Sequence, residues 1–592
     1  MGARLVFDGD CGFCRYSVEY ARGVTVDRVE YRSYQEVASE YLDVTTEEFA
    51  ASIQLFHTSE RYSGADAAFR TLALGGLGFW HVLYRYLPGF AICSEWLYRF
   101  VSTHRVGSLV IAKALFGASL RPAQFEQTAD WLYRGVMLMA LLALSSLWWQ
   151  IDALIGEHGI LPVADFLGAV REQLGSDAYL QVPTLLWIST SDTFVHGLCG
   201  LGLVACCIGI AGRARVTAAL LVYGVYLSLF YGGQIFMGYQ WDLLLIECLL
   251  LSALLAGHRK WGIWLFRLLL FRFMLLSGAA KLLSDDPTWV DASALAYHFE
   301  TQPLPTTLAW FAHHLPATLL KAGVYATLLI EIVFSFFVFL PRNPRLVAGC
   351  GFVLLELLIL LTGSYNFFNL LTIVMCLALL DDRLLRRLPH LRGVRLRHIT
   401  RHLVTGFGCL IAVLGLLVVL DSTTRSRVPR ALLEVFEPAR AVNRYGLFAV
   451  MTTKRDELVM EGSLDGVNWL AYGFPFKPGD VADHPRLATP HQPRLDWQMW
   501  FAALTTLERS PWVYGFASAL LRAEPAVLAL VEDPFAGASP AFVRVVRYRY
   551  RFTTPEERER NGDWWIRERI GLWSQEMRLR SPVVRHEPLT LD

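Results

Sequence analysis

The chain has 592 residues, of which 54% are hydrophobic and 18% are charged, and its formal net charge is +1. Soluble proteins usually carry about 25% charged residues, so this composition argues against an ordinary soluble protein and favours several membrane-spanning segments. Because the net charge is close to zero, no overall field would attract nucleic acid or an acidic substrate. We therefore expect a multi-pass membrane protein without a nucleic-acid partner.

The first 105 residues have the pattern of a small α/β domain. Strand-like segments RLVFD, DRVEYRS and SIQLF accompany a predicted helix from Cys14 to about Arg22. Residues 1–9 form a short strand-like stretch with acidic residues rather than a basic start followed by an apolar core, which predicts no secretory signal peptide. Residues 106–130 are expected to form an amphipathic connector along the membrane surface.

Two cysteines in this domain are close enough to act together. Cys11 follows the first predicted strand and begins the helix, and Cys14 lies one turn later; Asp8 and Asp10 precede them. Unpaired N–H groups and the helix dipole stabilise a thiolate at a helix N-terminus. The second thiol on the same face can resolve a mixed disulfide. The spacing thus indicates a dithiol with redox chemistry.

The segment LVFDGDCGFCRYSVEYARG, together with SGADAAF at 63–69, resembles the DCC family of thiol-disulfide oxidoreductase-like domains. The resemblance implies a thioredoxin-like fold for residues 1–105, no cofactor beyond the dithiol, and a redox partner protein. The domain departs from thioredoxins because no proline occurs before Pro88 to face the dithiol in the cis form. Two alternatives remain open: an inert fold, or half of a zinc site in which His57 is the nearby histidine.

Apolar segments in the middle of the chain predict a helical membrane bundle over residues 131–420. A span needs about 20 residues, so the eighth segment is short. The nine predicted spans are 131–150, 194–212, 216–233, 241–257, 261–279, 322–340, 345–362, 367–380 and 403–420. The loops 151–193 and 280–321 are long enough to form a cap at one end of the bundle.

Basic residues alternate between the two sides of this predicted bundle. One set of loops holds Arg213, Arg215, His258, Arg259, Lys260, Arg342, Arg345 and the basic run 383–401, and the other holds Arg171, Lys281 and Lys321. The positive-inside rule then places the N-terminal domain in the cytoplasm and the region after residue 420 on the opposite face. An even number of spans would break this assignment. We expect the cytoplasmic membrane, or the endoplasmic reticulum membrane in a eukaryote.

The last segment, residues 421–592, has the pattern of a soluble β-rich domain. Apolar and polar residues alternate in ELVMEGSLDGVNWLAYGF and FVRVVRYRYRFTT, and Asp465-Gly466 is a typical turn. We expect a sandwich-like arrangement of these strands.

Five segments of the membrane and tail regions resemble the lipase maturation factor family. They are FMGYQWDLLLIE at 236–247, WVDASALAYHFETQPLP at 289–305, NRYGLFAVMTTKR at 443–455, VMEGSLDGVNW at 459–469 and PHQPRLDWQMWFAAL at 490–504. The resemblance runs from about residue 130 to the end. It implies a chaperone-like membrane factor that helps secreted lipases or other exported clients reach their active form, with membrane lipids as further partners. Eukaryotic members of this family have the tail in the endoplasmic reticulum lumen.

The tail motifs supply candidate client-binding residues: Trp469, His491, Arg494, Asp496, Trp497 and Trp500. Arg494 and Asp496 are expected to pair, and the aromatic side chains would offer an apolar surface to unfolded clients. We expect at least three of the seven side chains Phe448, Trp469, Tyr472, Phe474, Phe476, Trp497 and Trp500 to be solvent-reachable and contiguous. The alternative is a structural motif in which His491 caps a turn and the tryptophans are buried.

Lys281 supports a different function. The segment RFMLLSGAAKLLSDDPTW resembles part of the vitamin K-dependent carboxylase group, in which such a lysine takes part in base chemistry. That resemblance implies a membrane enzyme that uses a lipid-like cofactor or substrate. Alternatively, Lys281 reaches the membrane interface and pairs with Asp285 or Asp286. The other acidic residues within predicted spans, Asp242, Glu247, Glu331 and Glu356, are expected to pair with polar groups inside the bundle.

Overall fold

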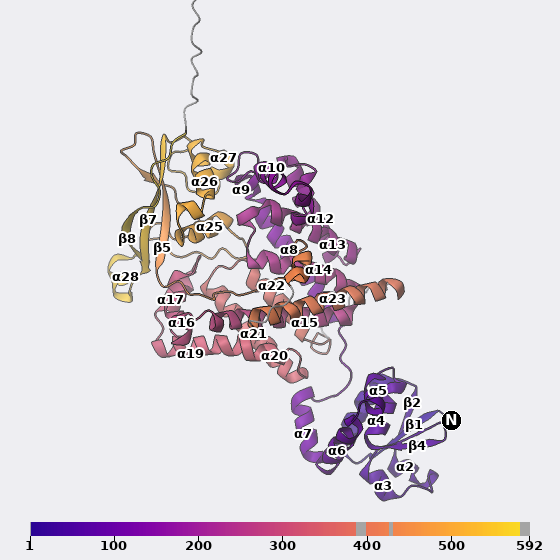
Figure 1. Cartoon of the computed structure of the whole chain (residues 1–592). Coiled ribbons are helices and arrows are strands. Elements are labelled where there is room, and N and C mark those ends of the chain that lie inside the picture. The colour runs from indigo at the N-terminus through magenta and orange to yellow at the C-terminus, as the bar shows by residue number, and fades with distance from the viewer. Residues whose placement is uncertain (1, 386–397, 425–429, 580–592) are drawn as a thin grey trace, which may run out of the picture. The chain divides into compact units, whose positions relative to one another are not determined.

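A computed structural model describes residues 2–385, 398–424 and 430–579 (Figure 1). The chain divides into two compact units. The smaller comprises Met1–Gln124 with Phe339–Val347 and Asp381–Arg383, and the larger comprises Phe125–Val338, Ala348–Leu380 and Leu384–Asp592. Part of the predicted basic run, residues 386–397, lies outside the described residues.

The smaller unit is built on a four-stranded sheet in the order β2-β1-β3-β4. Strand β1 pairs in parallel with β2 and antiparallel with β3, so that Leu5 lies opposite both Tyr31 and Leu55. Leu5, Val6 and Leu55 are buried between the sheet and its helices. The elements are β1 (Ala3–Phe7), α1 (Gly12–Thr25), β2 (Val29–Ser33), α2 (Tyr34–Val37), α3 (Thr46–Ala51), β3 (Gln54–His57), β4 (Glu60–Ser63), α4 (Gly64–Leu74), α5 (Phe79–Tyr86), α6 (Phe90–Thr103) and α7 (Arg105–Phe116). The predicted α/β domain is confirmed, and its sheet order fits the thioredoxin-like resemblance.

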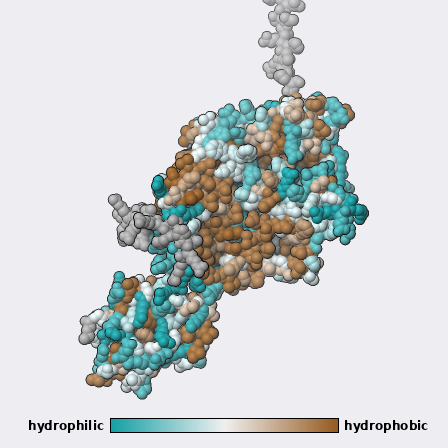
Figure 2. Space-filling model, turned by 180° about the vertical axis from the view of Figure 1, so that it is seen from behind, coloured by the Kyte–Doolittle hydropathy of each residue, from teal (hydrophilic) through white to brown (hydrophobic). Residues whose placement is uncertain are grey.

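Eight described helices, counting the interrupted helix α19–α20 as one, are long and apolar enough to cross a membrane. They are α8 (Glu126–Trp148), α12 (Asp192–Ile210), α13 (Arg215–Gly232), α14 (Gln240–Gly257), α15 (Arg259–Leu283), α19–α20 (Ala317–Phe337, with a π-helical turn at Leu329–Val333), α21 (Arg342–Thr362) and α23 (His398–Thr423). Figure 2 shows a broad hydrophobic surface on the larger unit. Exposed side chains such as Val204, Leu354 and Leu358 suit contact with lipid. The multi-pass helical bundle is confirmed.

The predicted span 367–380 forms the short helix α22 (Phe367–Met375) followed by a 3-10 turn at Cys376–Leu379. This segment is shorter than a lipid-exposed span, which needs about 20 residues. Its side chains Phe367, Phe368, Leu371 and Met375 are buried in protein. Because its neighbours shield it from lipid, irregular backbone at its end is tolerated. The Arg267 Nε donates to the carbonyl of Ala378 at that end (2.8 Å).

The two long loops at one end of the bundle fold into short helices. The first contains α9 (Ile151–Ile155), α10 (Val163–Leu174) and α11 (Ala178–Gln181), and the second contains α16 (Pro287–Val290), α17 (Ala294–Thr301) and α18 (Thr307–His313). The Trp310 Nε1 donates to the carbonyl of Thr553 (3.0 Å), which ties the second loop to the C-terminal region. We call this end of the bundle the loop end.

The C-terminal region contains an antiparallel sheet in the order β6-β5-β7-β8. Its elements are α24 (Arg430–Phe436), β5 (Arg455–Ser463), β6 (Leu470–Ala471), α25 (Arg494–Ala503), α26 (Trp512–Leu521), α27 (Pro525–Leu528), β7 (Phe542–Phe552), α28 (Pro555–Asn561) and β8 (Trp565–Leu572). The expected β-rich region is confirmed, but the sandwich is not. In the described part of the region, helices α25 and α26 pack on β5 and β7 in the place of a second sheet.

Candidate functional site

A buried ion pair joins the bundle to the C-terminal region. Asp242 lies in the first turn of α14, and Arg494 begins α25. The guanidinium of Arg494 donates to both carboxylate oxygens of Asp242 (2.8 and 3.0 Å), and the Tyr226 hydroxyl donates to the same carboxylate (2.6 Å). Asp242 and Arg494 are almost fully buried. Because an unpaired buried charge is strongly unfavourable, each residue needs the other.

The expected pairing of Arg494 with Asp496 is therefore wrong. Successive helix positions point in different directions, and Asp496 turns toward the loop before α25. Its Oδ1 accepts hydrogen bonds from the backbone N–H groups of Phe476 (3.0 Å) and Lys477 (2.9 Å). Burial raises the pKa of Asp496 to about 6, against the opposing effect of these bonds.

A second buried acid makes the same kind of connection. Glu247, on α14, pairs with Arg272 of α15 inside the bundle. Its Oε2 also accepts hydrogen bonds from the Tyr445 hydroxyl (2.9 Å) and the Asn443 Nδ2 (3.3 Å), both in the segment that follows α24. Glu247 thus has the expected partner inside the bundle and further partners in the C-terminal region.

The second long loop contributes two further connections. The Asp286 carboxylate caps α16 through the Thr288 N–H (2.8 Å) and accepts a hydrogen bond from the Met451 N–H (2.9 Å). Hydrogen bonds to this carboxylate outweigh its burial and lower the pKa of Asp286. The buried Arg455 guanidinium donates to three carbonyl oxygens of the same loop, those of Glu300, Gln302 and Pro303.

These contacts bring together four of the five segments that carry the lipase maturation factor resemblance. We call the set the motif junction; it comprises Asp242, Glu247, Asp286, Asn443, Tyr445, Arg455 and Arg494. Its members come from the bundle, from the second loop and from the C-terminal region. The junction fixes the C-terminal region on the loop end of the bundle.

Most of the aromatic side chains expected to meet a client are buried. Tyr472, Phe474, Trp497 and Trp500 are buried, whereas Phe448, Trp469 and Phe476 are partly buried. Trp497 packs against Trp241 and Tyr365 with ring centroids 4.7 and 5.6 Å apart, and the Trp500 Nε1 donates to the carbonyl of Thr301 (3.0 Å). Trp497 and Trp500 therefore fit the alternative prediction of a structural motif with buried tryptophans, because they fill the interface at the loop end.

The remaining two candidate client-binding residues, Trp469 and His491, have different neighbours. Trp469 lies beneath the Arg544 guanidinium, 3.9 Å from the ring centroid. His491 does not cap a turn through its side chain. Instead its Nδ1 bonds with the Ser146 hydroxyl of α8 (2.9 Å), and burial lowers the pKa of His491. His491 therefore belongs to the same interface as Trp497.

Lys281 pairs inside the bundle, and the expected pairing with Asp285 or Asp286 is wrong. Its Nζ donates to both carboxylate oxygens of Glu331 (2.8 and 2.9 Å), on the π-helical turn. Lys281 and Glu331 are both buried, so the amine does not reach the interface. The fourth acid, Glu356, accepts a hydrogen bond from the Asn369 Nδ2 (2.6 Å).

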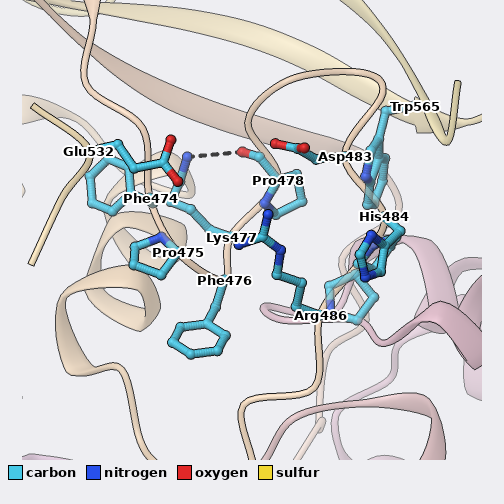
Figure 3. A pocket seen from close by; sticks show the side chains of 12 residues that line it. Phe474, Pro475, Phe476, Lys477, Pro478, Asp483, His484, Arg486, Glu532 and Trp565 are labelled. Carbon is cyan, nitrogen blue, oxygen red and sulfur yellow. Dashed lines mark hydrogen bonds between the residues drawn. The ribbon is translucent and has the colours of Figure 1, made fainter. Parts of the chain in front are cut away.

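A small pocket opens beside the loop that Asp496 holds. Pro475, Lys477, Asp483, Arg486 and Trp565 are among its lining residues (Figure 3). The Lys477 Nζ lies 3.2 Å from a Glu457 oxygen and donates to the carbonyls of Leu458 and Pro478, so its charge is satisfied within the protein.

The dithiol lies at the start of α1, as predicted. The Cys11 sulfur caps the helix by accepting a hydrogen bond from the Cys14 N–H (3.3 Å). Both cysteines are partly buried and neither is in a disulfide. Burial raises the pKa of the Cys14 thiol to about 12, with a further contribution from its neighbour Cys11. A thiol that stays protonated at neutral pH suits the resolving position, and the place of Cys11 at the start of α1 suits the nucleophile.

Arg105, at the start of α7, supplies a positive charge that the sequence alone did not identify. Its guanidinium donates to Asp8 (2.9 Å) and interacts favourably with both thiols. Hydrogen bonds from Gln35 and from backbone N–H groups outweigh burial and lower the pKa of Asp8. Asp10 is exposed and accepts a bond from the same Gln35 side chain (3.2 Å). Asp8 thus positions Arg105, whereas Asp10 lies on the surface.

His57, which the zinc alternative would use, lies on β3. Among the described residues, no group of three or more His, Cys, Asp or Glu side chains is arranged to hold a metal ion.

We predict that Arg494→Gln and Asp242→Asn each lower the stability of the detergent-solubilised protein by about 3–5 kcal/mol, because each leaves a buried partner unsatisfied. The double variant should lose clearly less stability than the sum of the two single losses. Thermal unfolding of the four proteins measures this coupling. Arg522→Gln, at an exposed pair with Glu524, is the control that should change little. Strictly additive losses would contradict the pairing.

Family models match three regions of the chain. Residues 5–110 match the DCC1-like thiol-disulfide oxidoreductase model, residues 127–387 match the lipase maturation factor transmembrane domain, and residues 441–574 match the lipase maturation factor C-terminal domain. Lys281 lies within the second match, so the comparisons support the lipase maturation reading and not the carboxylase alternative. No solved structure matches the chain.

Curated relatives agree with these matches. Lipase maturation factor 2 of Mus musculus is 34% identical, over 76% of this chain and 83% of the relative, and that of Homo sapiens is 33% identical, over 76% and 82%. Lipase maturation factor 1 of Bos taurus is 34% identical, over 76% of this chain and 90% of the relative. The chain therefore belongs to the lipase maturation factor family and carries an N-terminal DCC1-like thiol-disulfide oxidoreductase domain.

Proposed function

We propose that this protein is a membrane-embedded maturation factor for secreted lipases or related exported proteins. The observation that carries the proposal is the motif junction, in which family-specific segments hold the C-terminal region on the loop end of the bundle. A rigidly held region offers a client a surface of fixed geometry, and less ordering entropy is lost on binding. The names of the relatives suggest the client class.

We further propose that the loop end and the C-terminal region face outward, where exported proteins fold. The basic residues support this orientation, because Arg215, Arg259 and Arg342 each begin a candidate span at its opposite end. The short segment α22 runs between the two ends although it is too short to face lipid. It would then supply the ninth crossing, and the DCC1-like domain would lie in the cytoplasm.

The client surface is proposed to include the tip of the β5–β6 hairpin rather than the buried tryptophans. Leu464 and Val467 are 61% and 78% exposed there, and Leu470 is 48% exposed. The Asp465 carboxylate holds the tip by accepting hydrogen bonds from the N–H groups of Val467 and Asn468 (both 2.8 Å). Exposed apolar side chains on a rigid loop suit recognition of unfolded segments.

The DCC1-like domain is proposed to carry out thiol–disulfide exchange with a partner protein. The Cys11 thiolate would attack a partner disulfide, forming a mixed disulfide and releasing one partner thiolate. The Cys14 thiol would then lose its proton and attack the Cys11 sulfur. This step releases the second partner thiolate and leaves a Cys11–Cys14 disulfide, so the partner is reduced and the domain is oxidised.

We predict that the triple variant Leu464→Ser, Val467→Ser, Leu470→Ser strongly reduces the activity of a co-expressed secreted lipase without reducing lipase synthesis. The substitutions remove apolar contact area from side chains that are at least about half exposed, so folding should be maintained. Specific activity of the secreted lipase is the readout. The matched control is Val26→Ser with Leu42→Ser, which removes exposed apolar side chains from the smaller unit. Equal lipase activity in both variants would refute the hairpin surface.

For the dithiol, we predict that Cys11 alkylates several-fold faster than Cys14 at neutral pH. The raised pKa keeps the Cys14 thiol protonated at neutral and mildly alkaline pH, so its reactivity should increase only as pH approaches about 12. Mass spectrometry after short pulses of a maleimide on the full chain measures both rates. Arg105→Gln should slow the alkylation of Cys11, and Arg105→Lys should keep much of the original alkylation rate. Cys14→Ser should accumulate mixed disulfides through Cys11. Equal rates with no adduct would indicate an inert fold.

The orientation is tested by labelling in intact cells. A cysteine introduced at the exposed position Asn561, on α28, should react with a membrane-impermeant maleimide from outside. Cys11 should react only after permeabilisation. Labelling of both positions from the same side would contradict the nine-crossing arrangement.

A further inference from the structure

The last three helices of the DCC1-like domain have an inverted polarity. No side chain of α5, α6 or α7 is fully buried. On α6 the outward face is apolar: Ile92 is 78% exposed and Trp96 is 68% exposed, with Leu97 and Phe100 beside them. Helices of a soluble domain usually turn their apolar face inward, because packing of that face supplies most of their stability.

The inward face of α6 packs Phe90 against Phe69 and also makes polar contacts. Glu95 accepts hydrogen bonds from the Asp66 N–H (3.2 Å) and the Tyr84 hydroxyl (3.0 Å), and the Tyr98 hydroxyl accepts a bond from the Ile53 N–H (2.9 Å). These contacts fix the orientation of the helix. The outward position of Trp96 is therefore a consequence of specific bonds and not of loose packing.

The same surface continues over the neighbouring helices. Phe79 and Tyr86 on α5, and Val106 and Val110 on α7, are exposed, Val106 by 81%. By contrast, the exposed large hydrophobic residues among the described residues before Leu77 are Val26 and Leu42. The apolar side chains thus gather on one part of the domain. We call this surface the α5–α7 face.

The neighbours of α7 indicate what covers the α5–α7 face. The Asn343 Nδ2, in the first turn of the candidate span α21, donates to the carbonyl of Ala114 near the end of α7 (3.0 Å). Nine residues separate the end of α7 from the start of the span α8. The C-terminal end of α7 therefore lies beside the first turn of a candidate span, and the ends of spans of this length lie at the membrane surface.

The composition of the α5–α7 face suits the same location. Tyrosine and tryptophan favour the boundary between headgroups and acyl chains, and basic residues favour anionic lipid. Exposed Arg85, Arg99 and Lys113 accompany the aromatic side chains. We propose that the α5–α7 face lies in the membrane interface, so that the dithiol domain is bound to the lipid surface and not only tethered to the first span.

The test uses the full chain in vesicles of phosphatidylcholine and phosphatidylglycerol. Cys93, which is exposed on α6, carries an environment-sensitive fluorophore, and the control carries it at Leu42→Cys in a chain with Cys93→Ala. To keep labelling specific, Cys11 and Cys14 are replaced by Ser, and Cys207, Cys350 and Cys409 by Ala. Lipid-attached nitroxide should quench the fluorophore at Cys93 several-fold more than the fluorophore at position 42. Aqueous iodide should quench the fluorophore at position 42 more than the one at Cys93.

Negative charge introduced on the α5–α7 face should detach this face from the membrane. Ile92→Glu with Trp96→Glu should increase iodide quenching at Cys93 toward the value of the control, without loss of protein, because both side chains point outward. Equal iodide quenching at Cys93 and at position 42 before this change would overturn the proposal. Protection of Cys93 from both quenchers would overturn it too, because protein and not lipid would then cover the face.

Discussion

The pairing of Arg494 with Asp242 is the interaction on which the rest of the larger unit depends. Both charges are almost completely removed from water, and the Tyr226 hydroxyl completes the hydrogen bonding of the carboxylate. Moving one charge into such an environment alone is strongly unfavourable. Since Asp242 lies on a bundle helix and Arg494 on the first helix of the tail, neither part satisfies its buried groups without the other. The tail is consequently a component of the membrane protein's fold and not an appended domain.

This dependence explains why the family-specific segments are scattered along the chain. Asn443 and Tyr445 bond to Glu247, Met451 bonds to Asp286, and Arg455 bonds to the second long loop. Four of the five segments supply one side of a contact at the loop end. Residues that join two regions are constrained by both of them. The surface that meets a client can then lie elsewhere, on exposed residues such as Val467 whose position the junction fixes.

Much of the fold could be predicted from local patterns. Runs of about 20 apolar residues identify spans because the bilayer sets their length, and strand alternation with the Cys11 motif identified the dithiol domain. Contacts between distant residues could not be predicted in this way. Arg494 and Asp242 are 252 residues apart, and Arg105 and Asp8 are 97 apart. A sequence pattern also does not distinguish an exposed tryptophan from one that seals an interface, so both interpretations of Trp497 fit the sequence, and the structure shows that it is buried.

The most direct test is to cut the chain between the bundle and the tail and to measure whether the two fragments stay together. A protease site inserted between α23 and α24 would be cut in the detergent-solubilised protein, and the two fragments would be analysed by size-exclusion chromatography. Because buried charges are screened only weakly by salt, the fragments should co-elute even at high ionic strength, and Arg494→Gln should weaken their association. Separation of the unmodified fragments at low ionic strength would contradict the claim that the motif junction makes bundle and tail a single body.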